Sequence, residues 1–157
     1  MIASPRPKVV ISRCIEFDHC RYDGSLIPSD FVKSLMPFVD FRPVCAEMEI
    51  GLGVPRGSIR IVMADGEPRL VQPATGQDVT EKMRAFSAEF LSTVFEIDGF
   101  ILKYRSPSCG MKDIKVYSSL TKSGASTKMP GFFGGAVVNS FPDLAIEDEG
   151  RLRNFNI

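Results

Sequence analysis

Short apolar runs that read as buried strands recur along this chain, and three of them are followed by a cysteine. In an open α/β sheet the loops that follow the strands converge at one edge, where ligands bind. Three thiols delivered to that edge could hold a metal or a cluster with one coordination position left open. The runs and their cysteines are 8–12 with Cys14, 40–44 with Cys45, and 99–103 with Cys109.

The rest of the chain alternates strands with helices. Ser29 is a candidate N-cap for a first helix, and Thr80 is a candidate cap for the longest helix. Asp65 and Gly66, between two alternating segments, predict a β-hairpin. This order predicts an α/β fold of three layers, Rossmann-like, with a mainly parallel sheet flanked by helices and a β-hairpin insertion. The elements expected after 99–103 are a strand at 114–117, a mobile loop at 118–130 and a helix at 132–141.

Length and charge limit the class of protein. The 157 residues suffice for a single domain, 1–157, that buries a core without disulfides. The 19 basic and 19 acidic side chains cancel, so no strong field favours DNA or an anionic membrane, although a small RNA or a nucleotide could bind a local basic pocket. No apolar stretch approaches the roughly 20 residues that span a bilayer, and a cytoplasmic location is expected. Reduced cysteines in that compartment favour metal binding or catalysis over cross-linking.

Cysteine spacing alone leaves several kinds of site open. The wide separation of Cys14, Cys45 and Cys109 is unlike the close cysteine pairs of a ferredoxin or a zinc ribbon. Buried cysteines are also often only small apolar side chains. His19 is the single histidine, which excludes a zinc site with several histidines, and Cys20 beside it in a loop is interpreted as incidental.

The Ser-Pro-Ser-Cys-Gly segment at 106–110 is the most unusual in the chain. It predicts a tight turn, and backbone N–H groups at a following helix start could lower the pKa of the Cys109 thiol or bind an anion. No arginine follows the cysteine at the spacing that a cysteine phosphatase needs. Glu47, two residues after a candidate ligand, could act as a general acid or base. The segment 51–56 begins like a dinucleotide loop but lacks the third glycine.

Several motifs, specific in combination, are similar to those of one family. They lie at 12–14, 21–24, 44–47, 53–56, 75–76, 98–103, 106–110, 141–142 and 147–152. Together they resemble the bacterial thiouracil desulfidase (TudS-like) family, long catalogued as a domain of unknown function. The resemblance implies a [4Fe-4S] cluster held by three cysteines that match Cys14, Cys45 and Cys109. The fourth iron would have no protein ligand and would receive the sulfur of a thiolated base.

The resemblance also implies roles for other residues. Glu47 matches the family's acid/base and Ser106 its substrate-orienting hydroxyl. The implied reaction replaces C=S by C=O in thiouracil or a thiolated pyrimidine nucleotide. The chain departs from the family at Ala46, where proline is usual, and at Tyr104, where a small residue is usual. The candidate substrate-binding residues are Tyr22, Asp23, Lys103 and Arg105.

Two alternative functions remain open from the sequence. One is a binding module in which zinc or a cluster serves only structure or electron transfer. The other is a cluster-free enzyme that uses Cys109 as a nucleophile. Some relatives in the resembling family carry a second, helical domain after the segment that matches 151–157, and the sequence leaves the oligomeric state open.

Overall fold

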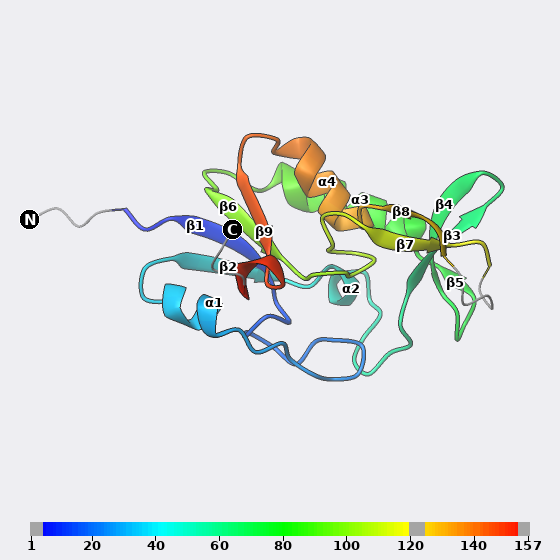
Figure 1. Cartoon of the computed structure of the whole chain (residues 1–157), viewed down its shortest axis with the longest axis horizontal. Helices are drawn as coiled ribbons and strands as arrows, with labels where there is room; N and C mark the ends of the chain where they lie inside the picture. Colours follow the sequence, from blue (N-terminus) through cyan, green and yellow to red (C-terminus); the bar gives the residue numbers. More distant parts are fainter. Residues whose placement is uncertain (1–4, 120–124, 154–157) are drawn as a thin grey trace, which may run out of the picture.

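The computed structural model describes residues 5–119 and 125–153 and contains two sheets, with helices packed around them (Figure 1). The parallel sheet has the order β2-β1-β6-β9 and the mixed sheet the order β5-β4-β3-β7-β8. The strands are β1 (Lys8–Ser12), β2 (Asp40–Val44), β3 (Arg60–Ala64), β4 (Glu67–Gln72), β5 (Gln77–Asp78), β6 (Gly99–Leu102), β7 (Ile114–Tyr117), β8 (Ala125–Met129) and β9 (Ala145–Asp148). The helices are α1 (Asp30–Leu35), α2 (Ala46–Glu49), α3 (Thr80–Ser92) and α4 (Phe132–Ser140), with a 3-10 turn η1 (Arg151–Arg153).

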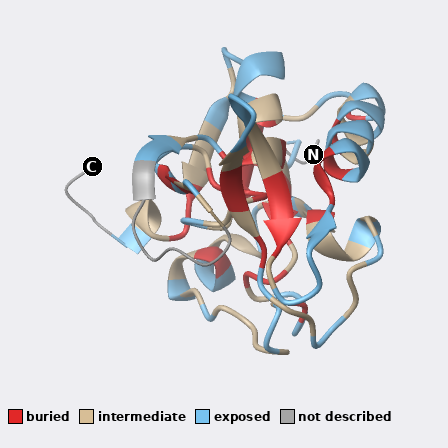
Figure 2. Cartoon of the chain, turned by 90° about the vertical axis from the view of Figure 1, so that its right-hand side faces the viewer, coloured by how far each residue is buried: buried red, intermediate tan, exposed pale blue. Residues whose placement is uncertain are grey.

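The parallel sheet is covered on both faces, because successive side chains of its strands point to opposite sides. Val10 and Phe100 pack with Phe133 of α4 in one apolar cluster. Ile11 packs with Val32 of α1 in a second cluster. Figure 1 shows α1 and α4 on opposite sides of this sheet, and Figure 2 shows the buried residues gathered along the central strands. The predicted Rossmann-like α/β class is confirmed.

The predicted hairpin is present as β3 and β4, joined at Asp65 and Gly66, which both have positive φ (51° and 80°). It is more than an insertion, because β7 pairs with β3 in parallel and extends the hairpin into the five-stranded mixed sheet. The prediction of a loop throughout 118–130 is wrong at its end. There β8 pairs antiparallel with β7, while residues 120–124 lie outside the described residues. A polar edge strand lacks the apolar alternation by which a strand is predicted.

The predicted N-cap is confirmed for α1 and is wrong for α3. Ser29 caps α1 as predicted, accepting a hydrogen bond at its Oγ from the N–H of Val32 at 3.2 Å. Thr80 is the first residue of α3 rather than its cap, and its Oγ1 accepts from the N–H of Leu70 at 2.7 Å. The Thr80 hydroxyl therefore ties the helix to β4. Within 5–119 and 125–153, no helix is both long enough and apolar enough to cross a membrane.

Candidate active site

The site lies at the carboxyl end of the parallel sheet. β1 stands between β2 and β6 and runs parallel to both, so the chain leaves these three strands at one edge, where the strand order reverses. A cavity of about 190 Å³ opens there and is lined by all four cysteines of the chain; we call it the cysteine cavity. The cysteines after the three predicted strands are thus brought together, as expected from the parallel order.

Backbone hydrogen bonds fix the turns that carry two of these thiols. The N–H of Arg13 donates to the carbonyl of Val44 at 2.8 Å, which joins the turns after β1 and β2. The carbonyl of Cys14 accepts from the N–H of Ile27 at 2.7 Å. Cys45 is the residue before α2, and its carbonyl accepts from the N–H of Glu49 at 3.0 Å. Cys14 and Cys45 therefore stand on backbone that is anchored on both sides.

The turn that carries Cys109 is built by Ser106 and held by α4. The Oγ of Ser106 accepts from the N–H groups of Ser108 at 3.2 Å and Cys109 at 3.0 Å. The N–H groups of Phe132 and Phe133, at the start of α4, donate to carbonyls of the same turn at 3.0 and 2.8 Å. No helix starts within residues 106–113, and the helix N–H groups that approach this turn are engaged by its carbonyls. Burial raises the pKa of the Cys109 thiol to about 12, so the predicted lowering is wrong.

Two glycines allow α4 to approach this turn. A Cβ on Gly131 would lie 2.8 Å from the carbonyl oxygen of Pro107. A Cβ on Gly134 would collide with the carbonyl oxygens of Cys109 and Gly110. Only glycine leaves room for backbone this close.

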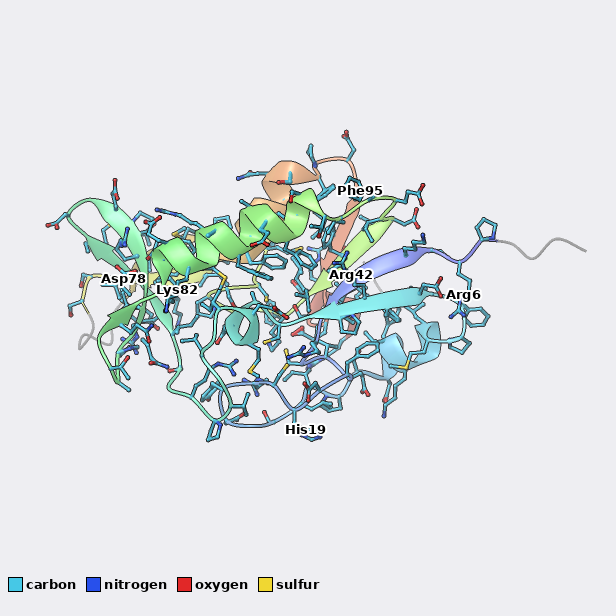
Figure 3. The ribbon with its side chains drawn as sticks, turned by 180° about the vertical axis from the view of Figure 1, so that it is seen from behind. Arg6, His19, Arg42, Asp78, Lys82 and Phe95 are labelled. Atoms are coloured by element: carbon cyan, nitrogen blue, oxygen red, sulfur yellow. The ribbon has the colours of Figure 1, made fainter. Side chains whose placement is uncertain are left out.

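Cys20 belongs to the site, although the sequence interpretation set it aside as incidental. Its side chain is 1% exposed and lines the cysteine cavity. Its thiol is in hydrogen-bonding contact with the thiols of Cys14 and Cys45. The Arg13 side chain also contacts it. His19, by contrast, is exposed and lies at the outer edge of the molecule in Figure 3.

Glu47 faces the cysteine cavity and accepts hydrogen bonds at both carboxylate oxygens. Its Oε2 accepts from Ser108 Oγ at 2.8 Å, and its Oε1 accepts from Arg56 Nε at 3.1 Å. The hydroxyls of Ser106 and Ser108 are 2.9 Å apart. Since the single proton of Ser108 is given to Glu47, Ser106 donates in this pair. The result is a directed hydrogen-bond chain from Ser106 through Ser108 to Glu47, which we call the hydroxyl chain.

Sequence reasoning missed Arg56 and Ser108. Arg56 was part of the segment excluded as a dinucleotide loop, yet its side chain is only 3% exposed. Its Nη1 donates to the carbonyl of Gly53 at 2.7 Å, which fixes the guanidinium beside Glu47. The available signal was an arginine placed shortly after a glycine-rich turn and a candidate acid/base.

The four candidate substrate-binding residues have different surroundings. The ammonium of Lys103 pairs with the Oε1 of buried Glu149 at 3.0 Å, so it is engaged on the wall of the cavity. Tyr22 and Arg105 are exposed and line the cysteine cavity. Asp23 is not among the lining residues, and its Oδ1 accepts from the hydroxyl of Ser25 at 2.6 Å. Substrate contact by these residues stays a prediction.

The four cysteines form a set of soft donors at one cavity. All four cysteines are free and buried. The pKa of Cys45 is raised, first by its hydrogen bond with Cys20 and then by burial. Among the described residues, no three His, Cys, Asp or Glu side chains converge as ligands of one metal ion. Cysteine thiolates are the usual ligands of iron–sulfur clusters, so the donors at this cavity fit such a cluster.

A second cavity, of about 750 Å³, adjoins the first and is rich in positive charge. It shares five lining residues with the cysteine cavity: Ser58, Ile59, Tyr104, Arg105 and Pro107. On its wall Lys115 of β7 and Lys128 of β8 stand directly opposite each other. We call it the basic cavity. Its cationic lining residues are Arg60, Arg105, Lys112, Lys115, Lys128 and Arg151, against Asp113 and Asp148.

Comparison with known proteins shows to which family and to which proteins the chain is similar. The family model described as 2-thiouracil desulfurase matches residues 9–149. The uncharacterized protein YbbK of Bacillus subtilis (strain 168) is 33% identical over 109 residues, which are 65% of this chain and 72% of YbbK. Among solved structures, the [4Fe-4S]-dependent thiouracil desulfidase TudS superposes with a TM-score of 0.65 over 94% of each chain, at 24% identity. That last similarity supports the fold.

Proposed function

Since the chain belongs to the 2-thiouracil desulfurase family, as its motifs predicted, we propose that it removes sulfur from a thiolated pyrimidine and replaces C=S by C=O. The observation that carries this proposal is the meeting of the buried cysteines with Glu47 in one cavity. A soft-metal ligand set and a general acid/base are both needed to take sulfur from a ring carbon and to add water to it.

We propose a [4Fe-4S] cluster as the cofactor, held by Cys14, Cys45 and Cys109. Three features of the chain support it: the thiols are reduced, they line one cavity, and Arg13 lines the same cavity with its guanidinium near Cys45. That positive charge would offset the negative charge of thiolate ligands. When bound, the cluster supplies a Lewis-acidic iron with affinity for sulfur.

Glu47 is the proposed acid/base. Arg56 and Ser108 fix the orientation of its carboxylate, which then takes a proton from the water that attacks the ring carbon. A protonated Glu47 can donate to Ser108 in turn, and this reverses the hydroxyl chain. Ser106 would then present a proton to the substrate, in agreement with its predicted orienting role. The hydroxyl chain thus moves a proton between water and substrate without a free base in solvent.

For the substrate, the basic cavity favours a thiolated nucleotide over a free base. Like charges directly opposite each other on paired strands destabilise a sheet, so the Lys115–Lys128 pair has a cost that a bound anion would offset. In such a complex the thiolated base lies in the cysteine cavity and its phosphate lies among the cationic side chains of the adjoining basic cavity. The Lys115→Ala/Lys128→Ala double variant should lower kcat/KM for a thiolated uridine 5′-monophosphate about tenfold and leave that for thiouracil unchanged. Lys82→Ala on α3, a residue that lines neither the cysteine cavity nor the basic cavity, is the matched control.

The deciding experiment is anaerobic preparation with iron and sulfide analysis, followed by incubation with thiouracil, its nucleoside and its monophosphate. Loss of thiocarbonyl absorbance with release of one sulfide per product is expected. The Glu47→Gln variant should keep its iron and lose turnover. A protein that holds its cluster yet converts none of the three compounds would contradict the proposed function, and a colourless protein with stoichiometric zinc would contradict the cofactor.

A further inference from the structure

Cys20 is the one thiol of the cysteine cavity that the proposed reaction does not use. It is closed to solvent, and it reaches the proposed ligands Cys14 and Cys45 from a different segment of the chain. Its own carbonyl lies 4.0 Å from the Sγ of Cys45. A buried thiol that touches two proposed cluster ligands stands where it can reach the same cluster.

The backbone distinguishes Cys20 from the other three cysteines. Cys14, Cys45 and Cys109 lie in turns that are hydrogen-bonded to strands or to α4. In the 18–28 segment the N–H of Arg21 donates to the carbonyl of Ser25 at 3.3 Å, but among the described residues no backbone–backbone hydrogen bond involves Cys20 itself. A thiolate at this position can leave and return without breaking a backbone hydrogen bond of its own residue.

Arg13 supplies an independent observation. Its buried Nε has no hydrogen-bond partner among the described residues, although Asp18 lies 3.3 Å away. The Arg13 side chain also contacts the Cys20 thiol. This places a positively charged side chain beside the Cys20 sulfur, which is a suitable partner for a thiolate ligand at that position.

We propose that Cys20 is an exchangeable fourth thiolate ligand of the cluster, bound to the substrate-binding iron until substrate sulfur displaces it. This rests on the proposed function and its cluster. In the exchange the iron–Sγ bond of Cys20 breaks and an iron–sulfur bond to the thiocarbonyl forms. Cys20 leaves as a thiolate beside the Arg13 guanidinium, so neither an oxidant nor a proton is consumed. The role is protective, because the iron is coordinated by a soft ligand whenever substrate is absent.

Cluster oxidation tests this without measuring turnover. One equivalent of ferricyanide removes one electron from [4Fe-4S]²⁺, and a cluster whose fourth iron lacks a thiolate then loses Fe²⁺ to give [3Fe-4S]⁺, which electron paramagnetic resonance detects. The wild type should retain its irons. Cys20→Ala should assemble the cluster and convert to the three-iron form at least about tenfold faster, with Cys20→Ser intermediate. Val44→Ala, which opens the same cavity but removes no thiol, should behave as wild type.

Binding of thiouracil separates exchange from permanent ligation. Displacing a bound thiolate weakens apparent affinity, so Cys20→Ala should bind thiouracil at least about tenfold more tightly than wild type. If Cys20→Ala binds thiouracil and the wild type does not, Cys20 is a permanent fourth ligand. That result would overturn the proposed exchange. Equal oxidation rates in wild type and Cys20→Ala would overturn the ligand role and leave the proposed function standing. A wild type that assembles no cluster would instead contradict the cofactor itself.

Discussion

Arg56 donates from Nε to the Oε1 of Glu47 at 3.1 Å, and these two side chains are only 3% and 14% exposed. A charge pair so closed to solvent depends on both partners, since removing one leaves the other buried without compensation. Arg56 is therefore a positioning residue for the proposed acid/base, while Ser108 constrains the other carboxylate oxygen.

Replacing Arg56 should damage stability and catalysis to different degrees. Arg56→Ala should lower the free energy of unfolding by about 3–5 kcal/mol, because Glu47 is left as an unpaired buried charge. Arg56→Lys should recover part of that stability, yet it cannot reproduce the fork that reaches both Glu47 and the carbonyl of Gly53. Urea unfolding and kcat measure the two effects. Wild-type kcat in Arg56→Lys would show that carboxylate orientation does not matter.

Breaking the hydroxyl chain should slow proton transfer without loss of iron from the site. Ser108→Ala removes the donor to Glu47, and kcat should fall about 10²-fold, within the usual contribution of a positioned proton-transfer group. Iron content should stay at the wild-type level. Ser34→Ala, whose hydroxyl donates to the carbonyl of Phe31 in an exposed turn at 2.6 Å, is the matched control. A kcat loss accompanied by equal loss of iron would point to a structural role for Ser108 instead.

Adding a methyl group at Gly134 should push α4 away from the Cys109 turn. The new Cβ would collide with the carbonyls of Cys109 and Gly110, and such overpacking costs about 1–3 kcal/mol. The melting temperature and the iron content of Gly134→Ala should both fall. At Gly135 a Cβ would meet only the side chain of Pro130, at 3.1 Å, so Gly135→Ala should keep its iron. Equal iron in both variants would refute the claim that α4 holds the turn.

The pH dependence of stability should include a contribution from Asp78. Burial raises the pKa of this carboxyl, but hydrogen bonds from Arg69 and Thr80 outweigh burial and hold the pKa below its ordinary value. Because the folded-state pKa is lowered, the stabilisation is present above the ordinary pKa and is lost as pH falls through the folded-state pKa. Asp78→Asn should cost up to about 1 kcal/mol at pH 7, since the pair is partly exposed. Urea unfolding should show this difference shrinking below pH 4; a constant difference would contradict the linkage.

The strand ends could be predicted from sequence, and so could the meeting of their cysteines. Apolar runs are local signals, and a parallel order follows from the alternation of strands with helices, so Cys14, Cys45 and Cys109 converge without any knowledge of loops. Cys20 could not be placed in this way, because its position depends on how the 13–28 segment returns to the sheet. No periodicity encodes such a return.

Polar strands and side-chain pairs that form across a turn were also beyond prediction from the sequence. β8 is too polar to show apolar alternation, and only its register with β7 defines it as a strand. The pair of Glu47 and Arg56 depends on a turn between them, where Arg56 reaches back to the carbonyl of Gly53. Local patterns report which face of an element is buried, and they do not report which side chains meet across a turn.

The start of α4 donates its N–H groups to the turn that carries Cys109. The helix and a cysteine of the site are therefore parts of one hydrogen-bonded unit. The next strand after α4 is β9, one of the two edge strands of the parallel sheet. A ligand that tightens the Cys109 turn must also slow the opening of α4 and of the strand behind it. Amide exchange at Phe132 and Phe133, at the start of α4, would then report whether the cavity is filled.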